Sequence, residues 1–182
     1  MTRADKVAGP EVGLAAADHA QGDPQAHVTL LEYGDYECPD SIGVEPWVRH
    51  LVDSSGSRLQ FVFRHFPLLA VHPDAQLAAE SAEAAAAQGQ FWPMHHLLFA
   101  QAHQLGPAAL TGYAAAIGLD MVRFKAEMAD RIYTQRVQEH RRAGERSGLR
   151  TTPAFFLNGR PVDISSGIEK LTEAVHAALN GP

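Results

Sequence analysis

One cysteine is the residue of this chain best suited to covalent chemistry. Cys38 is the single cysteine among 182 residues, and Pro39 follows it. Ser41 stands where a second thiol would complete a Cys-x-x-Cys pair. A thiolate can attack a disulfide and form a mixed disulfide with it. The segment therefore predicts a redox site that cannot close a disulfide of its own.

The expected position of Cys38 favours its thiolate form. The cysteine falls between a strand-like and a helical segment, so we expect it at a helix N-terminus. Unpaired backbone N–H groups and the positive end of the helix dipole stabilise an anion there. Pro39 suits the first helical position because its missing N–H costs no hydrogen bond. Ser41, one turn further on, is expected to point its hydroxyl at the sulfur and donate to it.

Three acidic residues near the cysteine are expected to destabilise its thiolate. Asp35, Glu37 and Asp40 flank Cys38 in the sequence, and like charge disfavours a thiolate. We expect the stabilisation of the thiolate by the helix terminus to exceed the repulsion by the acids, because the geometry of the terminus is fixed whereas the carboxylates can turn to solvent.

The first half of the chain predicts two parallel strands joined by a helix. Residues 27–33 and 58–64 are rich in β-branched and apolar residues with little alternation, which is typical of buried strands. Between them, an apolar stripe at helical spacing runs from Ile42 to Val52 and includes Trp47. Residues 1–26 are interpreted as a loose arm with a short edge strand near Ala17–Ala20.

The middle of the chain predicts helices only. Helical patterns cover residues 74–88, 91–103, 107–117, 120–130 and 134–146, with glycines or turns between most of them. This stretch is too long for a simple crossover between two parallel strands. We interpret residues 71–147 as a helical insertion between two parts of one sheet.

Strand character returns near the C-terminus. Residues 154–157 and 160–162 flank Asn158-Gly159, a sequence typical of a two-residue hairpin turn. A final amphipathic helix is expected over residues 168–179. The chain is thus predicted to be an α/β protein whose core comprises residues 27–70 and 148–182.

Composition excludes several classes of partner. The formal net charge is −6, and no basic stripe is visible, so nucleic acid is not expected. No secretory signal and no apolar run long enough to span a membrane is found, and no membrane association is expected. A single cysteine without an export signal favours the cytoplasm. The oligomeric state is not predicted.

Four segments together resemble the DsbA-like members of the thioredoxin superfamily. They are residues 31–41, which contain the cysteine, residues 61–67 (Phe-Val-Phe-Arg-His-Phe-Pro), residues 91–95 (Phe-Trp-Pro-Met-His) and residues 151–159 (Thr-Thr-Pro-Ala-Phe-Phe-Leu-Asn-Gly). The resemblance covers roughly residues 27–179. It implies a thioredoxin fold with an inserted all-helical subdomain, in agreement with the split pattern.

The resemblance also assigns roles to individual residues. It implies that the Thr152-Pro153 bond is cis and faces Cys38, so that Thr152 offers its backbone to a bound substrate; we place Asp40 at the same binding site. Glu32, six residues before the cysteine, would be a buried carboxylate that assists proton movement. The alternative for Glu32 is an exposed acid at a strand edge.

We therefore predict a monothiol thiol–disulfide oxidoreductase with protein or small-molecule disulfides and thiols as partners. It needs no cofactor, although a low-molecular-weight thiol such as glutathione is a possible co-substrate. Two alternatives remain: a kappa-type glutathione-transferase-like enzyme and a redox-inert peptide-binding module. Ser41 has three interpretations: it belongs to a natural monothiol site, it is an engineered Cys→Ser change, or it is a relic in a protein that has lost redox activity.

A metal site is not predicted. Among the ten histidines, His95, His96 and His103 are the closest to a ligand set, but no His-Glu-x-x-His motif is present. Neighbouring helical positions point about 100° apart, so His95 and His96 are not expected to share one ion easily.

Overall fold

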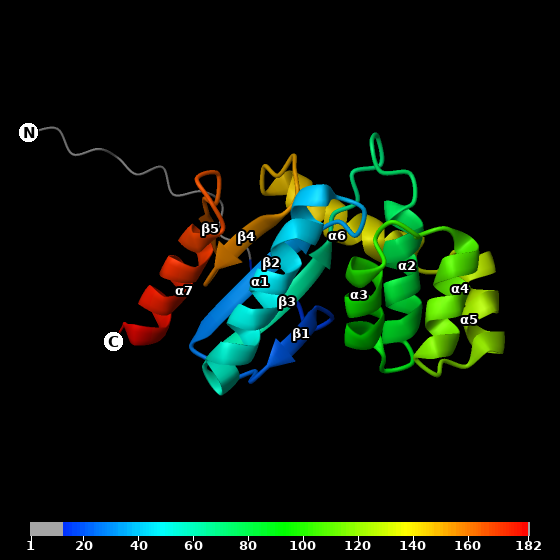
Figure 1. The fold of residues 1–182 in the computed structure, drawn as a ribbon, viewed down its shortest axis with the longest axis horizontal. Coiled ribbons are helices and arrows are strands. Elements are labelled where there is room, and N and C mark those ends of the chain that lie inside the picture. Colours follow the sequence, from blue (N-terminus) through cyan, green and yellow to red (C-terminus); the bar gives the residue numbers. More distant parts are fainter. Residues whose placement is uncertain (1–12, 182) are drawn as a thin grey trace, which may run out of the picture.

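The computed structural model describes residues 13–181, so residues 1–12 of the predicted N-terminal arm lie outside the described part. Five strands form one sheet with the order β1-β3-β2-β4-β5 (Figure 1). The strands are β1 (His19–Gly22), β2 (Val28–Gly34), β3 (Leu59–His65), β4 (Ala154–Leu157) and β5 (Arg160–Val162). The helices are α1 (Pro39–Ser55), α2 (Ala75–Ala86), α3 (Phe91–Ala100), α4 (Pro107–Ala116), α5 (Met121–Ala129), α6 (Thr134–Arg146) and α7 (Glu169–Asn180).

The topology confirms the predicted fold class. Strands β2 and β3 are parallel and are joined through α1, whereas β4 and β5 run antiparallel to their neighbours. Helices α2 to α6 follow β3 and precede β4; in Figure 1, α2 to α5 lie to one side of the sheet, whereas α6 runs back to it. The sequence thus folds as a thioredoxin fold with a helical insertion. Among the described residues, no helix has both the length and the apolar character to cross a bilayer.

Helices cover both faces of the sheet. Leu30 and Phe61 lie in the same buried cluster as residues of α1 and α7, which identifies one covered face. Leu31 and Tyr33 face the opposite way and pack with Phe66, because side chains alternate along a strand. Helix α6 approaches this second face closely: a Cβ on Gly144 would lie 2.7 Å from the Phe66 ring.

Local details agree with the sequence in some places and differ in others. Asn158 and Gly159 both have positive φ angles, of 48° and 79°, as a type I′ hairpin turn requires. The edge strand β1 forms two residues later than expected and pairs antiparallel with β3. Trp47 was expected on the buried stripe of α1, but it is 53% exposed. The periodicity identified the helix correctly and misplaced the edge of its buried face.

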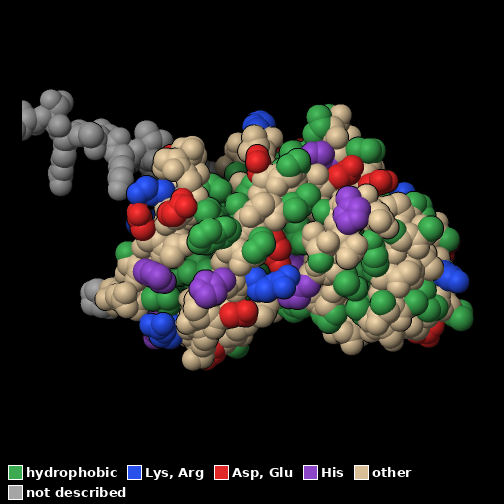
Figure 2. Space-filling view, viewed as in Figure 1, with side chains coloured by type: hydrophobic (Ala, Val, Ile, Leu, Met, Phe, Trp, Pro, Cys, Tyr) green, Lys and Arg blue, Asp and Glu red, His purple; other side chains and the backbone are tan. Residues whose placement is uncertain are grey.

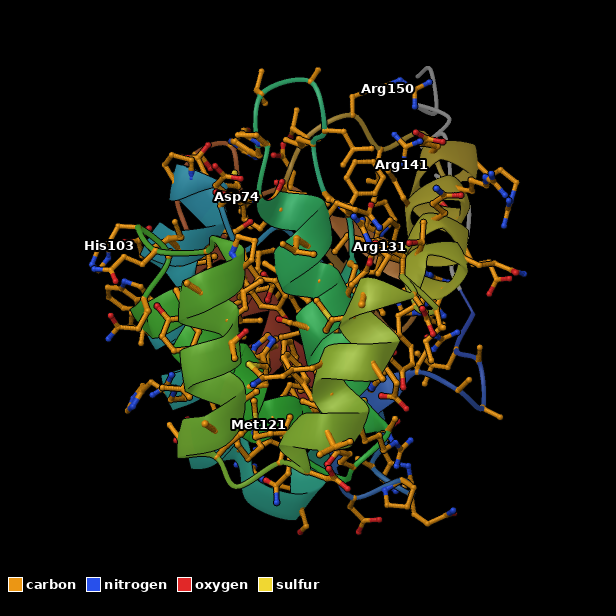
Figure 3. All side chains as sticks on the ribbon, turned by 90° about the vertical axis from the view of Figure 1, so that its right-hand side faces the viewer. Asp74, His103, Met121, Arg131, Arg141 and Arg150 are labelled. Atoms are coloured by element: carbon orange, nitrogen blue, oxygen red, sulfur yellow. The ribbon has the colours of Figure 1, made fainter. Side chains whose placement is uncertain are left out.

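An ion pair joins the insertion helices. Arg131, at the turn between α5 and α6, donates to both carboxylate oxygens of Glu80 on α2, and the Arg131 Nη2–Glu80 Oε1 distance is 2.8 Å. Thr134 donates to the same Glu80 Oε1 at 2.8 Å. Figure 3 shows Arg131 at this junction. The bidentate contact joins α2 to the turn that precedes α6.

A histidine cluster joins the insertion to the sheet. Glu83 Oε1 on α2 accepts hydrogen bonds from His19 Nε2 of β1 at 2.9 Å and from His65 Nε2 of β3 at 3.1 Å. The Nδ1 atom of His140 on α6 accepts the His65 backbone N–H at 3.3 Å. Four elements therefore meet at polar side chains that are mostly buried.

This cluster predicts a loss of stability in mild acid. Burial lowers the pKa of His140 to about 2 and also lowers the pKa of His65. In the unfolded chain these two histidines take up protons below about pH 6.5, whereas in the native state they stay neutral. The free energy of unfolding therefore falls as the pH decreases below about 6.5. We expect His140→Asn to reduce this slope by up to about 1.4 kcal/mol per pH unit between pH 6.5 and 4.

Urea denaturation at a series of pH values measures the slope. Substitution of the exposed His176 on α7 by Asn is the matched control and should leave it unchanged. An unchanged slope in His140→Asn would contradict the assignment.

Candidate active site

Cys38 occupies the N-cap of α1, at the carboxyl end of the central strand β2. Its backbone carbonyl accepts the first helical hydrogen bond, from Ile42 N at 3.0 Å, and Pro39 occupies the first turn. The Cys38 N–H donates to the Asp35 carbonyl at 3.1 Å, which closes the turn between strand and helix. The side chain is only 5% exposed. The helix therefore begins at the sulfur-bearing residue, as the sequence predicted.

The segment before β4 faces the cysteine. The Thr152–Pro153 peptide bond is cis, and Cys38 Sγ donates a hydrogen bond to the Thr152 carbonyl oxygen at 3.3 Å. The sheet register explains this proximity, because Tyr33 of β2 pairs with Ala154 of β4. The structure thus brings together Cys38, Thr152 and Pro153 from segments more than a hundred residues apart.

Ser41 is fully buried beneath the turn. Its hydroxyl oxygen accepts the Asp35 N–H at 3.4 Å. Among the hydrogen bonds of residues 13–181, none joins Ser41 to Cys38, so the expectation that its hydroxyl donates to the sulfur is not met. The backbone of the turn is the nearer partner, and Ser41 contributes to the shape of the site.

The expectation that the neighbouring carboxylates turn to solvent was wrong for two of the three. Asp35 is 2% exposed and accepts the Glu37 N–H at 2.8 Å. Glu37 in turn accepts the backbone N–H of Asp74, just before α2, at 2.8 Å. Only Asp40 is exposed. Two acids thus bind backbone donors, which partly neutralise their charge beside the thiol.

Asp35 is the functional residue whose role the sequence did not reveal. Beyond the Glu37 N–H, its Oδ2 accepts from Leu68 N at 2.8 Å and contacts His72 Nδ1 at 2.7 Å. This one carboxylate therefore connects the turn that carries Cys38 to the loop after β3. The only sequence signal was an acid directly after the Gly34 strand end, and its partners Leu68 and His72 are more than thirty residues away.

Glu32 is buried in the sheet face beneath α1. It is 1% exposed, which makes the alternative of an exposed edge acid wrong. It pairs with Phe63 and Phe155 on the neighbouring strands. Its Oε1 has no hydrogen-bond partner in the described structure. Burial, with a smaller contribution from the charge of Glu45, raises the pKa of Glu32 well above its usual range.

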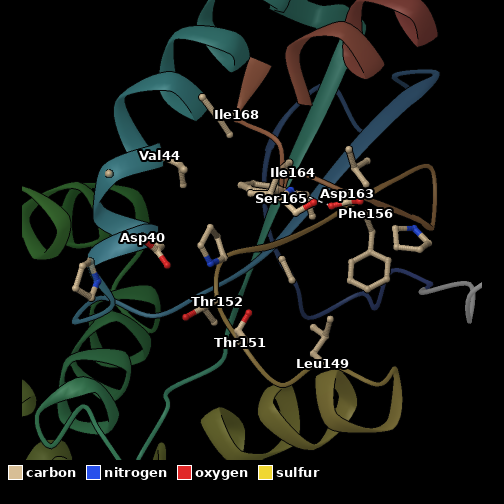
Figure 4. A pocket seen from close by; sticks show the side chains of 17 residues that line it. Asp40, Val44, Leu149, Thr151, Thr152, Phe156, Asp163, Ile164, Ser165 and Ile168 are labelled. Carbon is tan, nitrogen blue, oxygen red and sulfur yellow. Dashed lines mark hydrogen bonds between the residues drawn. The ribbon is translucent and has the colours of Figure 1, made fainter. Parts of the chain in front are cut away.

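A cavity of about 690 Å³ opens beside the cysteine turn (Figure 4). Asp40 borders it from α1, and Thr151 and Thr152 border it from the segment before β4. Apolar side chains complete much of the wall. They include Pro39, Val44, Leu149, Pro153, Phe155, Phe156, Pro161, Ile164 and Ile168. The cavity therefore combines an apolar wall with the polar side chains of Asp40, Thr151 and Thr152 next to the cysteine turn.

The hydrogen bonds of Asp35 predict its importance for stability. Asp35→Ala leaves the N–H groups of Glu37 and Leu68 without their acceptor, and an unpaired buried donor costs about 1–3 kcal/mol. We expect the free energy of unfolding in urea to fall by about 2–4 kcal/mol.

Asp40→Ala is the control for this measurement. Because Asp40 is an exposed first-turn acid, its loss should cost less than about 1 kcal/mol. Equal effects of the two substitutions would contradict the role assigned to Asp35.

Curated relatives of this chain carry the name of a transporter. The Na(+)/H(+) antiporter NhaA 1 of Salinispora arenicola is 46% identical over 164 residues, which cover 90% of this chain and 25% of that protein. The Na(+)/H(+) antiporter NhaA of Herminiimonas arsenicoxydans is 36% identical, with 90% and 26% covered. The chain thus spans about a quarter of the length of the curated relatives it matches.

Several solved structures share the fold. BdbD from Bacillus subtilis superposes with a TM-score of 0.81 at 19% identity, covering 96% of this chain and 98% of BdbD. A thioredoxin-like oxidoreductase from Silicibacter pomeroyi gives 0.77 at 24% identity, covering 91% and 94%. Wolbachia pipientis alpha-DsbA1 gives 0.76 at 18% identity, covering 91% and 92%.

One protein family accounts for almost the whole described chain. The family described as Thioredoxin matches residues 15–177. The match includes the Cys38 turn, the helical insertion and the Thr152–Pro153 segment. The chain therefore belongs to the thioredoxin family and has the DsbA-like form of its fold.

Proposed function

We propose that this protein is a thiol–disulfide oxidoreductase that acts through Cys38 alone. The observation that carries the proposal is the position of the sulfur. It lies at the N-terminus of α1, 3.3 Å from the Thr152 carbonyl and beside the cavity that Pro39 and Thr152 border. A helix terminus stabilises a thiolate, and in this proposal the neighbouring cavity receives the substrate. Cys38 is the chain's only cysteine, so the thiol that resolves the mixed disulfide must come from outside this chain.

The reaction proceeds through two exchanges. The Cys38 thiolate attacks one sulfur of a substrate disulfide; a bond forms between them, and the other sulfur leaves as a thiolate that takes up a proton. A low-molecular-weight thiol such as glutathione then attacks the mixed disulfide and releases Cys38. When the substrate is a glutathione mixed disulfide, the substrate thiol is reduced and oxidised glutathione leaves. No other redox cofactor is required.

The Thr152 carbonyl serves the two protonation states of Cys38 differently. It accepts the S–H proton while the cysteine is a thiol. Once the proton leaves, that hydrogen bond is lost and the carbonyl can accept a backbone N–H of a bound peptide. Loss of the S–H hydrogen bond thus frees the Thr152 carbonyl oxygen for the substrate, so deprotonation of Cys38 and substrate binding favour each other.

Glu32 is proposed to take part in moving this proton. A buried carboxyl without a hydrogen-bond partner is stable when protonated. Its raised pKa allows both states to be populated at higher pH than for an ordinary glutamate. These properties support a group that accepts and returns a proton beneath the helix that carries Cys38.

The proposal concerns this chain and not the whole of its relatives. Antiporter activity is named for proteins of which the chain covers about a quarter. The partners proposed here are protein or small-molecule disulfides and thiols. A reducing compartment such as the cytoplasm would supply the thiol that completes the cycle.

Removal of the sulfur should abolish the reaction. We expect Cys38→Ala to reduce a glutathione mixed disulfide, with glutathione present, no faster than the solution without protein. Ser41→Ala keeps the sulfur and is expected to retain most of the activity. Stopped-flow or coupled absorbance assays give the rates. Equal rates for the parent protein and Cys38→Ala would exclude the proposal and favour a redox-inert binding module.

Glu32→Gln should change both stability and turnover. Because the folded-state pKa of Glu32 is raised, the native protein binds its proton more tightly than the unfolded chain. Stability is therefore lost as pH rises above the usual glutamate pKa of about 4.3. We expect Glu32→Gln to become progressively more stable than the parent protein as pH rises through this window, and to be slower by about 100-fold.

Parallel urea titrations and rate measurements from pH 4 to 9 test this pair of effects. Glu173→Gln, on the exposed face of α7, is the matched control. A parent-like pH profile of the rate in Glu32→Gln would remove the proton-transfer role, even if its stability changed.

A further inference from the structure

We propose that Glu45, His95 and His96 form a binding site for a zinc ion between α1 and α3. The ligand atoms of these three side chains all lie within 4.8 Å of one another. Glu45 Oε1 is 3.3 Å from His96 Nδ1, and Glu45 Oε2 is 3.9 Å from His95 Nε2. Two nitrogen or oxygen ligands of tetrahedral zinc, each about 2.1 Å from the metal, are themselves about 3.4 Å apart. The separations need only small side-chain rotations to match.

The structure resolves the objection drawn from the sequence. Adjacent helical residues do point in different directions, but His95 presents Nε2 and His96 presents Nδ1 toward the same carboxylate. The sequence argument considered only the histidines and left out Glu45, which is fifty residues earlier on α1. Two histidines and one carboxylate are a ligand set that zinc uses in proteins.

A second layer of contacts supports His95 as a ligand. Its Nδ1 lies 3.0 Å from the hydroxyl of Tyr36, in the loop before α1. With Nε2 bound to a metal, Nδ1 carries the proton and donates it to the Tyr36 oxygen. Metal-bound histidines almost always have such a partner, which fixes the orientation of the ring. Both His95 and Tyr36 are buried, so the ring is held in place before any ion arrives.

Arg49 occupies the position next to the ligands. Its Nη2 lies 3.0 Å from Glu45 Oε1 and 3.3 Å from His96 Nδ1. The guanidinium thus donates to the two atoms that would hold the ion. Its side chain is 47% exposed and can move away. Arg49 therefore competes with zinc and compensates the Glu45 charge when zinc is not bound.

A small cavity gives access to the ligands. It has a volume of about 190 Å³ and is bordered by Glu45, His95 and His96 together with Arg49 and Asp53. Figure 2 shows acidic, basic and histidine side chains meeting on the surface where α1 approaches α3. Water in the cavity can fill the fourth coordination position of zinc, as it does where three protein ligands bind the ion. Occupancy would link the helix that begins at Cys38 directly to the helical insertion.

Zinc titration of the untagged, metal-free protein against a chromophoric chelator tests the proposal. We expect one bound zinc ion per chain in the parent protein and in Cys38→Ala. His96→Ala should bind zinc at least tenfold more weakly than the parent protein. His50 is exposed on α1, and His50→Ala should leave zinc binding unchanged. Zinc should also raise the thermal unfolding midpoint of the parent protein but not that of His96→Ala.

Arg49→Ala is the second variant, and it keeps all three ligands. Removal of the competing guanidinium should make zinc binding tighter than in the parent protein. Weaker binding in Arg49→Ala would contradict the proposal. So would the absence of stoichiometric zinc in the parent protein, loss of binding in Cys38→Ala, or binding that His96→Ala leaves intact. In the last case the His19, His65 and Glu83 cluster would be the binding site.

Discussion

The site depends on one constraint, the central position of β2 in the sheet. Strand β2 pairs with β3 on one side and with β4 on the other. The end of β2 at Gly34 therefore lies beside the end of β3 and the beginning of β4. The turn after β2 delivers Cys38 to the start of α1, and the turn before β4 delivers Thr152 and Pro153. This pairing order places both segments at one edge of the sheet.

The acids around the sulfur show how this edge balances its charges. Asp35 and Glu37 lie close to the thiol in sequence, yet backbone N–H groups and His72 compensate them. Glu32, in contrast, lies in an apolar part of the sheet, and one of its oxygens has no partner. The site thus contains two acids that hold the turns in place through backbone hydrogen bonds and one buried acid, Glu32, whose pKa burial raises. The difference arises because the Asp35 and Glu37 side chains reach backbone N–H donors and Glu32 Oε1 does not.

The sequence predicted the secondary structure of the described residues well, because apolar periodicity, glycine breaks and the Asn-Gly turn are local signals. Through the family resemblance it also predicted that Cys38 meets the Thr152–Pro153 pair and that Glu32 is buried. It could not predict the partners of Asp35 or the proximity of Glu45 to the His95–His96 pair. Except for the contact with Glu37, these contacts join residues more than thirty positions apart, so tertiary packing decides them and no local pattern does.

The central claim is that Cys38 works without a resolving thiol in this chain, and one measurement tests it most directly. Protein is treated with oxidised glutathione, freed of small thiols, and followed by intact mass. The account predicts a single, persistent glutathione adduct on the parent protein. Ser41→Cys should instead discharge the adduct and end with an internal disulfide, because positions 38 and 41 lie one helical turn apart. A parent protein that forms no adduct, or that loses it as fast as Ser41→Cys without added thiol, would contradict the account.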